Sequence, residues 1–488
     1  LEEVIENCLS RTVGYTPSDF PLVRLQQSEI DKIVSQVGEI ESIYPLTGTQ
    51  AGMLFHSDYL QKDAGVYCEQ LLLEILNSCS PKHLLEAWQR TAQQHAALRT
   101  VILHHSRVEP LQVVKRNVAV ELEECDWSDE DYTEELLWEK LQALLDCDRA
   151  KSHKLDEGAW RLILIKVNQE RSYLLWSFHH IILDGWSFAK VMSDLFLNYE
   201  QVVSNQPSLV SIGPQFEEFV RYTLNQKANE AISYWKNYLQ GVAAHTPLGL
   251  KIGEVYSCLD SEKTSEQIVV LDSQKTTALN HFIRTNHMTL SDVVQAIWSV
   301  LLGQYNATDD VVFGITVSGR SAEIGDIENI VGMLINTIPK RFKIDRDKTF
   351  VDWAKSSRNE ASFQQTHELT PLYLIQQYSD VPSDEPLIDS IVVIENYPLD
   401  ERLGSLQLPV KIGSVNFYEK TNFPLSLVVV PGNEIQIRLT YDRQKYNRQT
   451  VQTVLEHFSR ILDQLLEEPR LLVGQINVLS SEERASQL

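Results

Sequence analysis

Residues 177–187 carry the side chains best suited to chemistry in this chain. They read Ser-Phe-His-His-Ile-Ile-Leu-Asp-Gly-Trp-Ser, so the adjacent histidines His179 and His180 are followed, after three aliphatic residues, by Asp184 and Gly185. An imidazole can accept and return a proton near neutral pH. A nearby carboxylate can hold the local structure, and a glycine lets the backbone turn. This combination suits an acyl-transfer site.

The elements around these residues decide which histidine can meet a substrate. Residues 161–167 and 172–178 are predicted strands, and the Asn-Gln-Glu-Arg sequence of residues 168–171 between them indicates a hairpin. Ser187 is the predicted N-cap of a helix that runs through Tyr199. Neighbouring side chains on an extended segment point in opposite directions. One histidine is therefore expected to face the site and the other the core.

The composition describes a large and acidic globular chain. It has 488 residues, of which 43% are hydrophobic and 23% charged, and a formal net charge of −24. Two domains or lobes are expected at this length, and the acidic surface argues against nucleic acid or anionic lipid as the main partner. No apolar run is long enough to span a bilayer, and no signal peptide is present. The six scattered cysteines indicate reduced thiols in a cytoplasmic protein.

The order of the remaining patterns divides the chain into three parts. Residues 1–39 are rich in turn formers and are predicted to be the tail of an upstream domain followed by a linker. The chain starts with a leucine and not a methionine, so it is expected to be a piece of a longer polypeptide. Residues 40–205 and 206–488 both mix strands and helices, which is compatible with two related α/β lobes. The other predicted helices are 28–37, 81–95, 215–240, 273–285, 291–305 and 448–466, and the other predicted strands are 67–75, 266–271, 310–317, 387–397 and 435–441.

At residues 179–185 the chain resembles the condensation domains of nonribosomal peptide synthetases, whose signature is HHxxxDG. Other segments are similar to the family's further motifs, in order: residues 44–56, 95–100, 216–222 with 234–235, 318–320 with 331–337, 421–425 and 441–443. The resemblance covers nearly the whole chain after residue 40. It implies the α/β fold of chloramphenicol acetyltransferase, with two related lobes that form a V-shaped pseudo-dimer around a central tunnel.

The resemblance also implies an activity and its partners. Peptide bonds would form when the amine of an aminoacyl group on a downstream carrier domain attacks a peptidyl thioester on an upstream carrier domain. The peptidyl and aminoacyl groups would be attached to phosphopantetheine arms of those carriers, so the domain itself would bind no cofactor and no metal. Adjoining epimerisation and adenylation domains are the other implied partners, and the product would be an antibiotic or another secondary metabolite.

Two segments are similar to the subtype that joins a D-configured donor to an L-configured acceptor. They are residues 50–56, Gln-Ala-Gly-Met-Leu-Phe-His, and residues 386–398. Residues 1–10 and 14–21 also resemble the end of an epimerisation domain and the linker that follows it. An epimerase at that place would supply the D-configured residue.

The resemblance assigns roles to residues of the motif. His180 is expected either to take the proton of the amine or to hydrogen-bond the amine and the tetrahedral intermediate, and His179 is expected to be structural. Asp184 is expected to pair with an arginine, for which Arg99 of the second motif is the candidate. Gly185 would permit a backbone angle or offer its N–H to the oxyanion. Three further residues are candidates for lining the substrate tunnel, with ordinary packing or loop roles left open: Trp186, Ser318 and Asn336.

Other interpretations of the same fold stay open. An epimerisation domain shares HHxxxDG, but it usually continues with a small residue and Ser-Trp-Arg and uses an added glutamate, whereas Trp186 and Ser187 follow directly here. A free-standing acyltransferase that uses coenzyme A is disfavoured by the linker-like start. A catalytically silent carrier-docking domain typically lacks the second histidine or the aspartate, and both are present.

Overall fold

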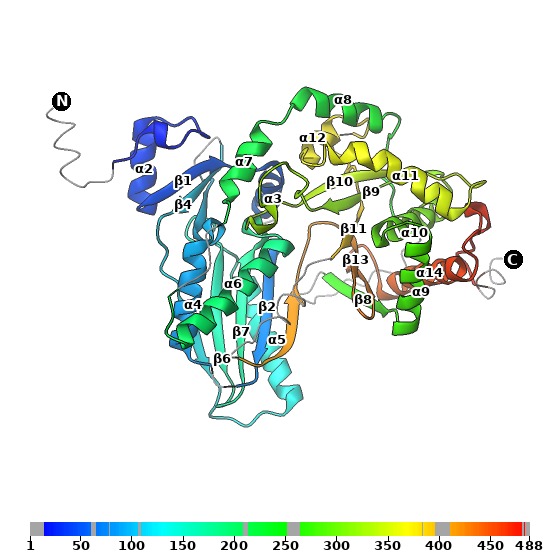
Figure 1. The fold of residues 1–488 in the computed structure, drawn as a ribbon. Coiled ribbons are helices and arrows are strands. Elements are labelled where there is room, and N and C mark those ends of the chain that lie inside the picture. The colour runs from blue at the N-terminus through cyan, green and yellow to red at the C-terminus, as the bar shows by residue number, and fades with distance from the viewer. Residues whose placement is uncertain are drawn as a thin grey trace. The chain divides into compact units, whose positions relative to one another are not determined.

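The protein's structure, a computed structural model, describes residues 14–59, 65–77, 79–105, 109–207, 213–250, 264–382, 384–395, 410–480 and 483. Helices and strands are interspersed along the chain, which divides into two units (Figure 1). The first unit comprises Leu1–Asn225, Ala322–Met333 and Pro398–Lys420, and the second comprises Gln226–Ser321, Leu334–Tyr397 and Thr421–Leu488. Two segments of the second half of the sequence therefore return to the first unit, which a division after residue 205 does not provide for.

The first unit is built on a sheet of five strands in the order β12-β2-β7-β6-β5. Its strands are β2 (Cys68–Ile75), β5 (Leu122–Asp126), β6 (Trp160–Lys166), β7 (Ser172–His179) and β12 (Ile412–Tyr418). All neighbours pair antiparallel except β5 and β6, which are parallel. The predicted hairpin of two strands before the histidines is confirmed as β6 and β7.

Helices cover both faces of this sheet, as Figure 1 shows. On one face, Leu71 of β2 and Trp176 of β7 share a buried cluster with Trp88 of α4 (Pro81–Gln94) and with α6 (Gly185–Val203). On the other face, Leu72 and Leu175 pack against α5 (Glu134–Ala150). Because side chains alternate along a strand, Trp176 and Phe178 face α6, while Ser177, whose hydroxyl donates to Asp148 of α5, faces the other side.

A second, three-stranded sheet completes this unit. It has the order β1-β4-β3, with β1 (Ile40–Pro45), β3 (Thr100–Leu103) and β4 (Leu111–Lys115). Phe20, Ile30 and Ile33 are buried against it, so the described part of the predicted linker is packed into the fold. The unit's other helices are η1 (Pro17–Asp19), α2 (Gln27–Val37), α3 (Gly48–Tyr59), η2 (Ala96–Arg99), η3 (His180–Ile182), α7 (Phe216–Leu224) and η4 (Ile327–Asn329).

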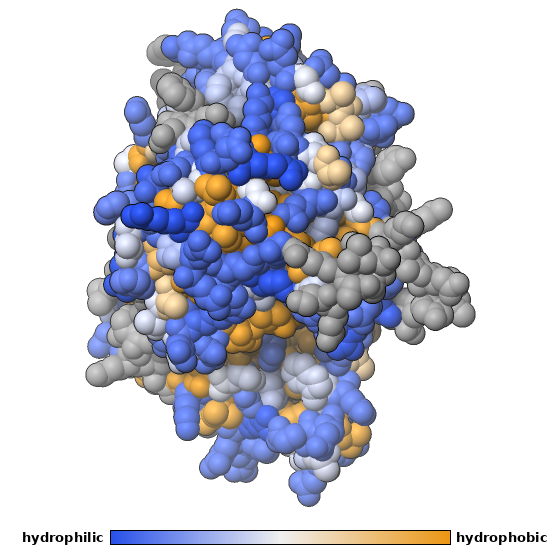
Figure 2. All heavy atoms as spheres, turned by 90° about the vertical axis from the view of Figure 1, so that its right-hand side faces the viewer, coloured by the Kyte–Doolittle hydropathy of each residue, from blue (hydrophilic) through white to orange (hydrophobic). Residues whose placement is uncertain are grey.

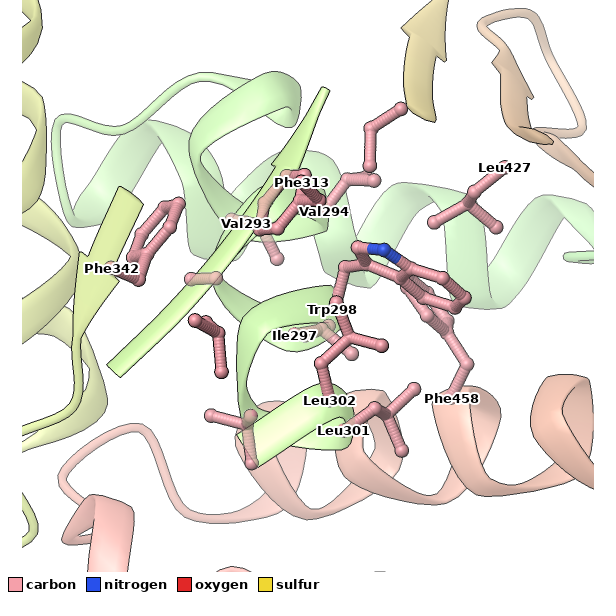
Figure 3. Packing of buried hydrophobic residues seen from close by; sticks show 14 of the residues in the cluster. Val293, Val294, Ile297, Trp298, Leu301, Leu302, Phe313, Phe342, Leu427 and Phe458 are labelled. Carbon is pink, nitrogen blue, oxygen red and sulfur yellow. The ribbon is translucent and has the colours of Figure 1, made fainter. Parts of the chain in front are cut away.

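The second unit has a six-stranded sheet in the order β10-β9-β11-β13-β14-β8. Its strands are β8 (Thr264–Val270), β9 (Asp310–Val317), β10 (Asn336–Lys343), β11 (Ser390–Ile394), β13 (Leu425–Val430) and β14 (Gln436–Asp442). Its helices are α8 (Ala228–Tyr238), α9 (Ser273–Thr285), α10 (Leu290–Tyr305), α11 (Phe350–Gln365), α12 (Leu372–Gln377), α14 (Arg448–Glu467) and η5 (Val473–Gln475). Figure 3 shows its core, where Trp298 of α10 lies between Leu427 of β13 and Phe458 of α14.

Local patterns predicted most of these elements. The helix over 273–285 and the strand over 310–317 have the predicted bounds, whereas the helix predicted over 215–240 is divided into α7 and α8. Figure 2 shows a face on which hydrophilic side chains predominate and hydrophobic ones form small groups. Among the helices that the structure describes, none is both long and apolar enough to cross a membrane.

Candidate active site around His180

His180 lies at the end of β7, where the chain turns into η3. Its backbone N–H donates to the carbonyl of Tyr67 at 2.8 Å, and its ring Nδ1 lies 2.6 Å from the carbonyl oxygen of Leu183. A carbonyl oxygen only accepts hydrogen bonds, so Nδ1 carries the proton and Nε2 keeps its lone pair. The side chain is 8% exposed. The backbone of η3 therefore fixes both the ring position and the tautomer.

His179 has the opposite tautomer and different hydrogen-bond partners. Its Nδ1 accepts a hydrogen bond from the N–H of Ile181 at 3.1 Å, so the proton sits on Nε2, 3.2 Å from the hydroxyl oxygen of Ser57. This side chain is the N-cap of η3 and is 5% exposed. Its ring nitrogens are thus engaged in holding the turn, which fits the structural role expected for His179.

Burial keeps both imidazoles neutral at pH 7. It lowers the pKa of His180, against which the Leu183 carbonyl and the Asp184 carboxylate act to raise it. Burial also holds the pKa of His179 well below 6.5, and the neighbouring histidines His153 and His180 lower it further. His180 therefore presents an unprotonated Nε2 over the neutral pH range, as a general base requires.

Asp184 caps the helix that follows the histidines. Its Oδ1 accepts from the N–H of Ser187 at 2.8 Å, and α6 begins at Gly185. The prediction that Ser187 is the cap is wrong, because its hydroxyl instead bonds the backbone of Gly332, donating to the carbonyl at 2.8 Å and accepting from the N–H at 3.0 Å. Gly185 has a φ outside the left-handed region, so the structure shows no backbone angle there that requires glycine.

The predicted ion pair between Arg99 and Asp184 is corrected by the structure. The guanidinium of Arg99, 4% exposed, binds the carboxylate of Glu41 at 2.7 and 3.2 Å and the carbonyls of Ala92 and Lys115. Arg99 ends η2 beside the three-stranded sheet, where it meets Glu41 of β1. The sequence could not show this, because the partner lies 58 positions away on another strand.

The three candidate tunnel residues have different surroundings. Trp186 is partly buried in the first turn of α6. Ser318 is exposed after β9, and its Oγ accepts from the N–H of Arg320 at 3.3 Å. Both residues remain candidates for substrate contact.

Asn336, the third candidate, is buried at the start of β10 in the second unit. Its amide donates to the carbonyl oxygens of Glu368 and Thr370, each at 2.8 Å. These bonds tie β10 to the loop after α11, so Asn336 has at least a structural role.

Sequence reasoning missed two carboxylates beside His180. Glu69 of β2 and Glu419, just after β12, each bring a carboxylate oxygen to a ring nitrogen of His180, and all three atoms lie within 4.8 Å of one another. Donors of these types at such distances could also hold a cation, although no metal was expected. One signal was present for Glu69, because a glutamate inside an apolar strand is rarely buried without a reason.

A buried polar network lies on the face of β7 that packs against α5. Asp148, which is fully buried, accepts from Ser177, from Gln70 at 2.7 Å and from Arg161 at 2.5 Å. Arg161 also contacts Nδ1 of His153 at 3.4 Å.

Cys68 lies beside this network, with its sulfur 3.8 Å from Nε2 of His153. Burial lowers the pKa of His153 to about 3 and raises the pKa of the Cys68 thiol to about 12. Both groups are therefore neutral at pH 7, and Cys68 is not an activated nucleophile.

The two-unit mixed α/β fold is that of the chloramphenicol-acetyltransferase-like class, to which condensation domains belong. A solved structure of the first condensation domain of the calcium-dependent antibiotic synthetase, in complex with a substrate analogue, superposes with a TM-score of 0.72 at 18% identity, covering 90% of this chain and 99% of that one. The family profile described as "Condensation domain" matches residues 40–488. The chain belongs to the condensation-domain family.

Curated relatives match almost the whole chain. One of the linear gramicidin synthase proteins of Brevibacillus parabrevis is 33% identical over 491 residues, which cover 99% of this chain and 6% of that protein. Bacitracin synthase 3 of Bacillus licheniformis is 30% identical over 492 residues, covering 99% of this chain and 8% of that protein. The chain thus spans less than a tenth of the length of these two relatives.

Proposed function

We propose that this chain forms peptide bonds in nonribosomal peptide synthesis, with His180 as the general base. The observation that carries the proposal is the neutral, buried imidazole whose Nδ1 is fixed by Leu183 and whose Nε2 keeps its lone pair. The acceptor is the amine of a carrier-bound aminoacyl group, and the donor is a carrier-bound peptidyl thioester. The membership of this chain in the condensation-domain family supports the assignment of both the acceptor and the donor.

The reaction requires only modest activation of the acceptor amine but accurate placement of both tethered substrates. An α-amino group has a pKa of about 7.7–8.0, so much of it is already neutral near pH 7.5. As the amine attacks the thioester carbonyl, one N–H proton passes to Nε2 of His180. The C–S bond then breaks, and the imidazolium returns the proton to the departing thiolate. Alignment of two tethered substrates supplies about 7–11 kcal/mol of barrier reduction in the ideal case, and general-base catalysis adds about 10²- to 10⁴-fold.

We also propose that the donor ends in a D-configured residue. The support is the similarity of residues 50–56 to the D-donor subtype, and these residues lie in α3. Gln50, the first of them, is fully buried and donates to the carbonyl of Ile181 at 2.9 Å and to the side chain of Gln112 at 2.8 Å. The motif is therefore in direct contact with the turn that positions His180.

The proposed partners follow from the same reaction. Upstream and downstream carrier domains would deliver both cargoes on phosphopantetheine arms. Epimerisation and adenylation domains would adjoin this one, in the same or a partner polypeptide in the cytoplasm. The segment similar to the end of an epimerisation domain, residues 1–10, lies outside the described residues.

A single-turnover assay tests the proposal. An upstream carrier loaded with a D- or an L-terminated dipeptide and a downstream carrier loaded with an amino acid are mixed with the protein, and intact-protein mass spectrometry follows the dipeptide. We expect transfer with the D-terminated donor, and a loss of about 10²- to 10⁴-fold in His180→Ala. His105→Ala, which changes an exposed histidine of the same unit, is the matched control and should retain full activity.

Other outcomes would identify the alternatives. Equal use of both donors would contradict the stereochemical proposal alone. Deuterium exchange at the donor Cα without transfer would indicate an epimerisation domain. Carrier binding with neither reaction, unchanged in His180→Ala, would indicate a silent docking domain.

A further inference from the structure

The carbonyl of Ile181, in the middle of η3, is held by a side chain from another helix. Its oxygen accepts a hydrogen bond from the amide of Gln50 in α3 at 2.9 Å. If η3 continued for one more residue as a 3-10 helix, the N–H of Asp184 would bond this carbonyl. That N–H donates to the carbonyl of Gly332 at 3.2 Å instead. The Gln50 amide therefore takes the place of a backbone donor in η3.

The Gln50 amide is itself fixed by a second buried amide, that of Gln112 in β4. Nε2 of Gln50 donates to Oε1 of Gln112 at 2.8 Å, and Nε2 of Gln112 donates to Oε1 of Gln50 at 2.9 Å. Oε1 of Gln50 also accepts from the N–H of Thr47 at 2.9 Å, and Gln112 also donates to the carbonyl of Pro45 at 3.0 Å. Each of the four amide hydrogens of the pair thus has an acceptor.

This amide pair gives η3 a fixed place in the unit. Both side chains are buried, and hydrogen bonds away from water hold their geometry strongly when every group is satisfied. The pair joins the end of β1, the start of α3 and β4 to the turn that follows β7. The ring of His180 is bonded within the same turn, to the carbonyl of Leu183. A displacement of η3 would therefore carry the His180 ring with it.

We propose that Gln50, held by Gln112, is a positioning residue that determines where η3 places Nε2 of His180. This role rests on the proposed condensation function, in which that nitrogen takes the proton of the amine. Gln50 acts through the carbonyl of Ile181 and exchanges no proton itself, because an amide does not titrate. A misplacement of about 1 Å at a reacting group can cost about 10²-fold in rate, so the accuracy of this contact matters more than its strength.

A double-mutant cycle with His180 separates positioning from general support of the fold. Gln50→Met keeps the length of the side chain and removes its amide. In the single-turnover transfer assay with both carriers saturating, we expect Gln50→Met to lower the rate about 10- to 100-fold. In a His180→Ala background the same change should alter the remaining rate less than about 2-fold, because no imidazole is left to position. A loss by the same factor in both backgrounds would overturn the positioning role.

Another glutamine of the same unit gives the matched control. Gln89 of α4 also binds the backbone through both ends of its amide, donating to the carbonyl of Val118 at 2.6 Å and accepting from the N–H of Val120 at 3.1 Å. Gln89→Met should keep the full transfer rate even if it lowers the stability. Gln112→Met leaves the contact of Gln50 with η3 in place but removes its support, so it should lose less activity than Gln50→Met. This variant keeps the question answerable if Gln50→Met does not fold.

Nitrogen NMR of protein with ¹⁵N-labelled histidine tests the same role without any substrate. The His180 signals are those that disappear in His180→Ala, and their shifts tell a ring nitrogen with a proton from one with a lone pair. We expect the wild type to carry the proton on Nδ1, and Gln50→Met to exchange between the two tautomers as the bond to Leu183 loosens. Identical shifts and line widths in the two proteins would overturn the positioning role.

The two measurements distinguish failure of this inference from failure of the proposed function. If His180→Ala transfers as fast as the wild type, the general-base assignment is rejected, and the NMR result still decides whether Gln50 holds the ring. If His180→Ala loses transfer and Gln50→Met does not, the base is retained and the positioning role is rejected.

Discussion

At the residue scale, the two histidines of the motif differ because the backbone gives them different partners. The N–H of Ile181 donates to Nδ1 of His179, whereas Nδ1 of His180 donates to the carbonyl of Leu183. The ring of His179 therefore stabilises the turn, and the ring of His180 keeps a lone pair on Nε2. The sequence predicted different roles for the two histidines, and the structure shows the hydrogen-bond partners that distinguish their rings.

His179→Ala should weaken the fold and the site together. It leaves the buried N–H of Ile181 and the hydroxyl of Ser57 without their ring partner, and an unsatisfied buried group costs about 1–3 kcal/mol. Urea denaturation should show that loss, and the transfer rate should fall because η3 no longer fixes His180. Ser57→Ala removes only the second hydrogen bond and should cost about 1 kcal/mol. Unchanged stability in His179→Ala would contradict the capping role.

The His153 side chain should make the protein sensitive to acid. Its pKa, about 3 in the folded protein through burial and the nearby Arg161 charge, is below the ordinary value of 6.5 that holds after unfolding. Between these values the unfolded state binds the extra proton, so the stability that the neutral ring contributes is present above pH 6.5 and decreases as the pH falls toward 3. The expected slope is about 1.4 kcal/mol per pH unit.

The measurement is urea denaturation at intervals from pH 7 to pH 4.5. His153→Gln should reduce the slope of stability against pH by about 1.4 kcal/mol per unit, while the buried His179 retains its own contribution. His105→Ala, at an exposed position, should leave the slope as in the wild type. A slope that does not change in His153→Gln would show that this ring is protonated in the folded protein.

At the element scale, the start of α6 is held from two directions. Asp184 caps the helix from within, and Ser187 binds both backbone groups of Gly332. The N–H of Asp184 also donates to the Gly332 carbonyl at 3.2 Å. The turn with the histidines thus depends on a segment that follows it by almost 150 positions, within the family's motif at residues 331–337.

Gly332→Ala should disturb this attachment. A Cβ at Gly332 would overlap the ring of Phe216, which is itself buried and stacked on Phe219. The ring cannot move freely, so the expected loss of stability is about 1–3 kcal/mol, as for overpacked cores. Gly325→Ala is the matched control, since among the described residues, its chain neighbours aside, no heavy atom lies within 4 Å of a Cβ added there. Equal thermal midpoints for the two variants would contradict the close approach.

At the scale of the whole molecule, the first unit is completed by chain that comes from the second half. β12 forms the edge of the five-stranded sheet next to β2, and the N–H of Leu76 and the N–H of Tyr67 donate to the carbonyls of Lys411 and Lys420. Ser414 binds the buried carboxylate of Glu74 through its N–H and its hydroxyl, at 2.8 and 2.9 Å. The segment is therefore a structural part of the unit that contains His180.

The sequence predicted what depends on neighbours along the chain. Hydrophobic periodicity located the strand before His179, and the motif spacing located the histidines themselves. It could not predict contacts between distant segments. The binding of Arg99 to Glu41, the attachment of Ser187 to Gly332 and the approach of Glu419 to His180 all depend on how strands pair. Each involves side chains whose types allow many partners, and only the three-dimensional fold selects one.

A fragment of residues 14–225 tests whether the first unit needs the returning segments. Without β12, the backbone edge of β2 from Cys68 to Ile75 loses its partner, and Val410 no longer covers the α4–α6 face. We expect the fragment to unfold in urea with a broad transition, because the unpaired edge of β2 weakens the sheet. We also expect it to bind a dye for exposed apolar surface, because its hydrophobic core is no longer fully covered. Joining residues 410–420 to its end through a Gly-Ser linker should sharpen the transition, and the same residues in scrambled order should not. A fragment that unfolds as sharply as the full chain would show that β2 is stable as an edge strand and that the fold of the unit does not depend on the second half of the chain.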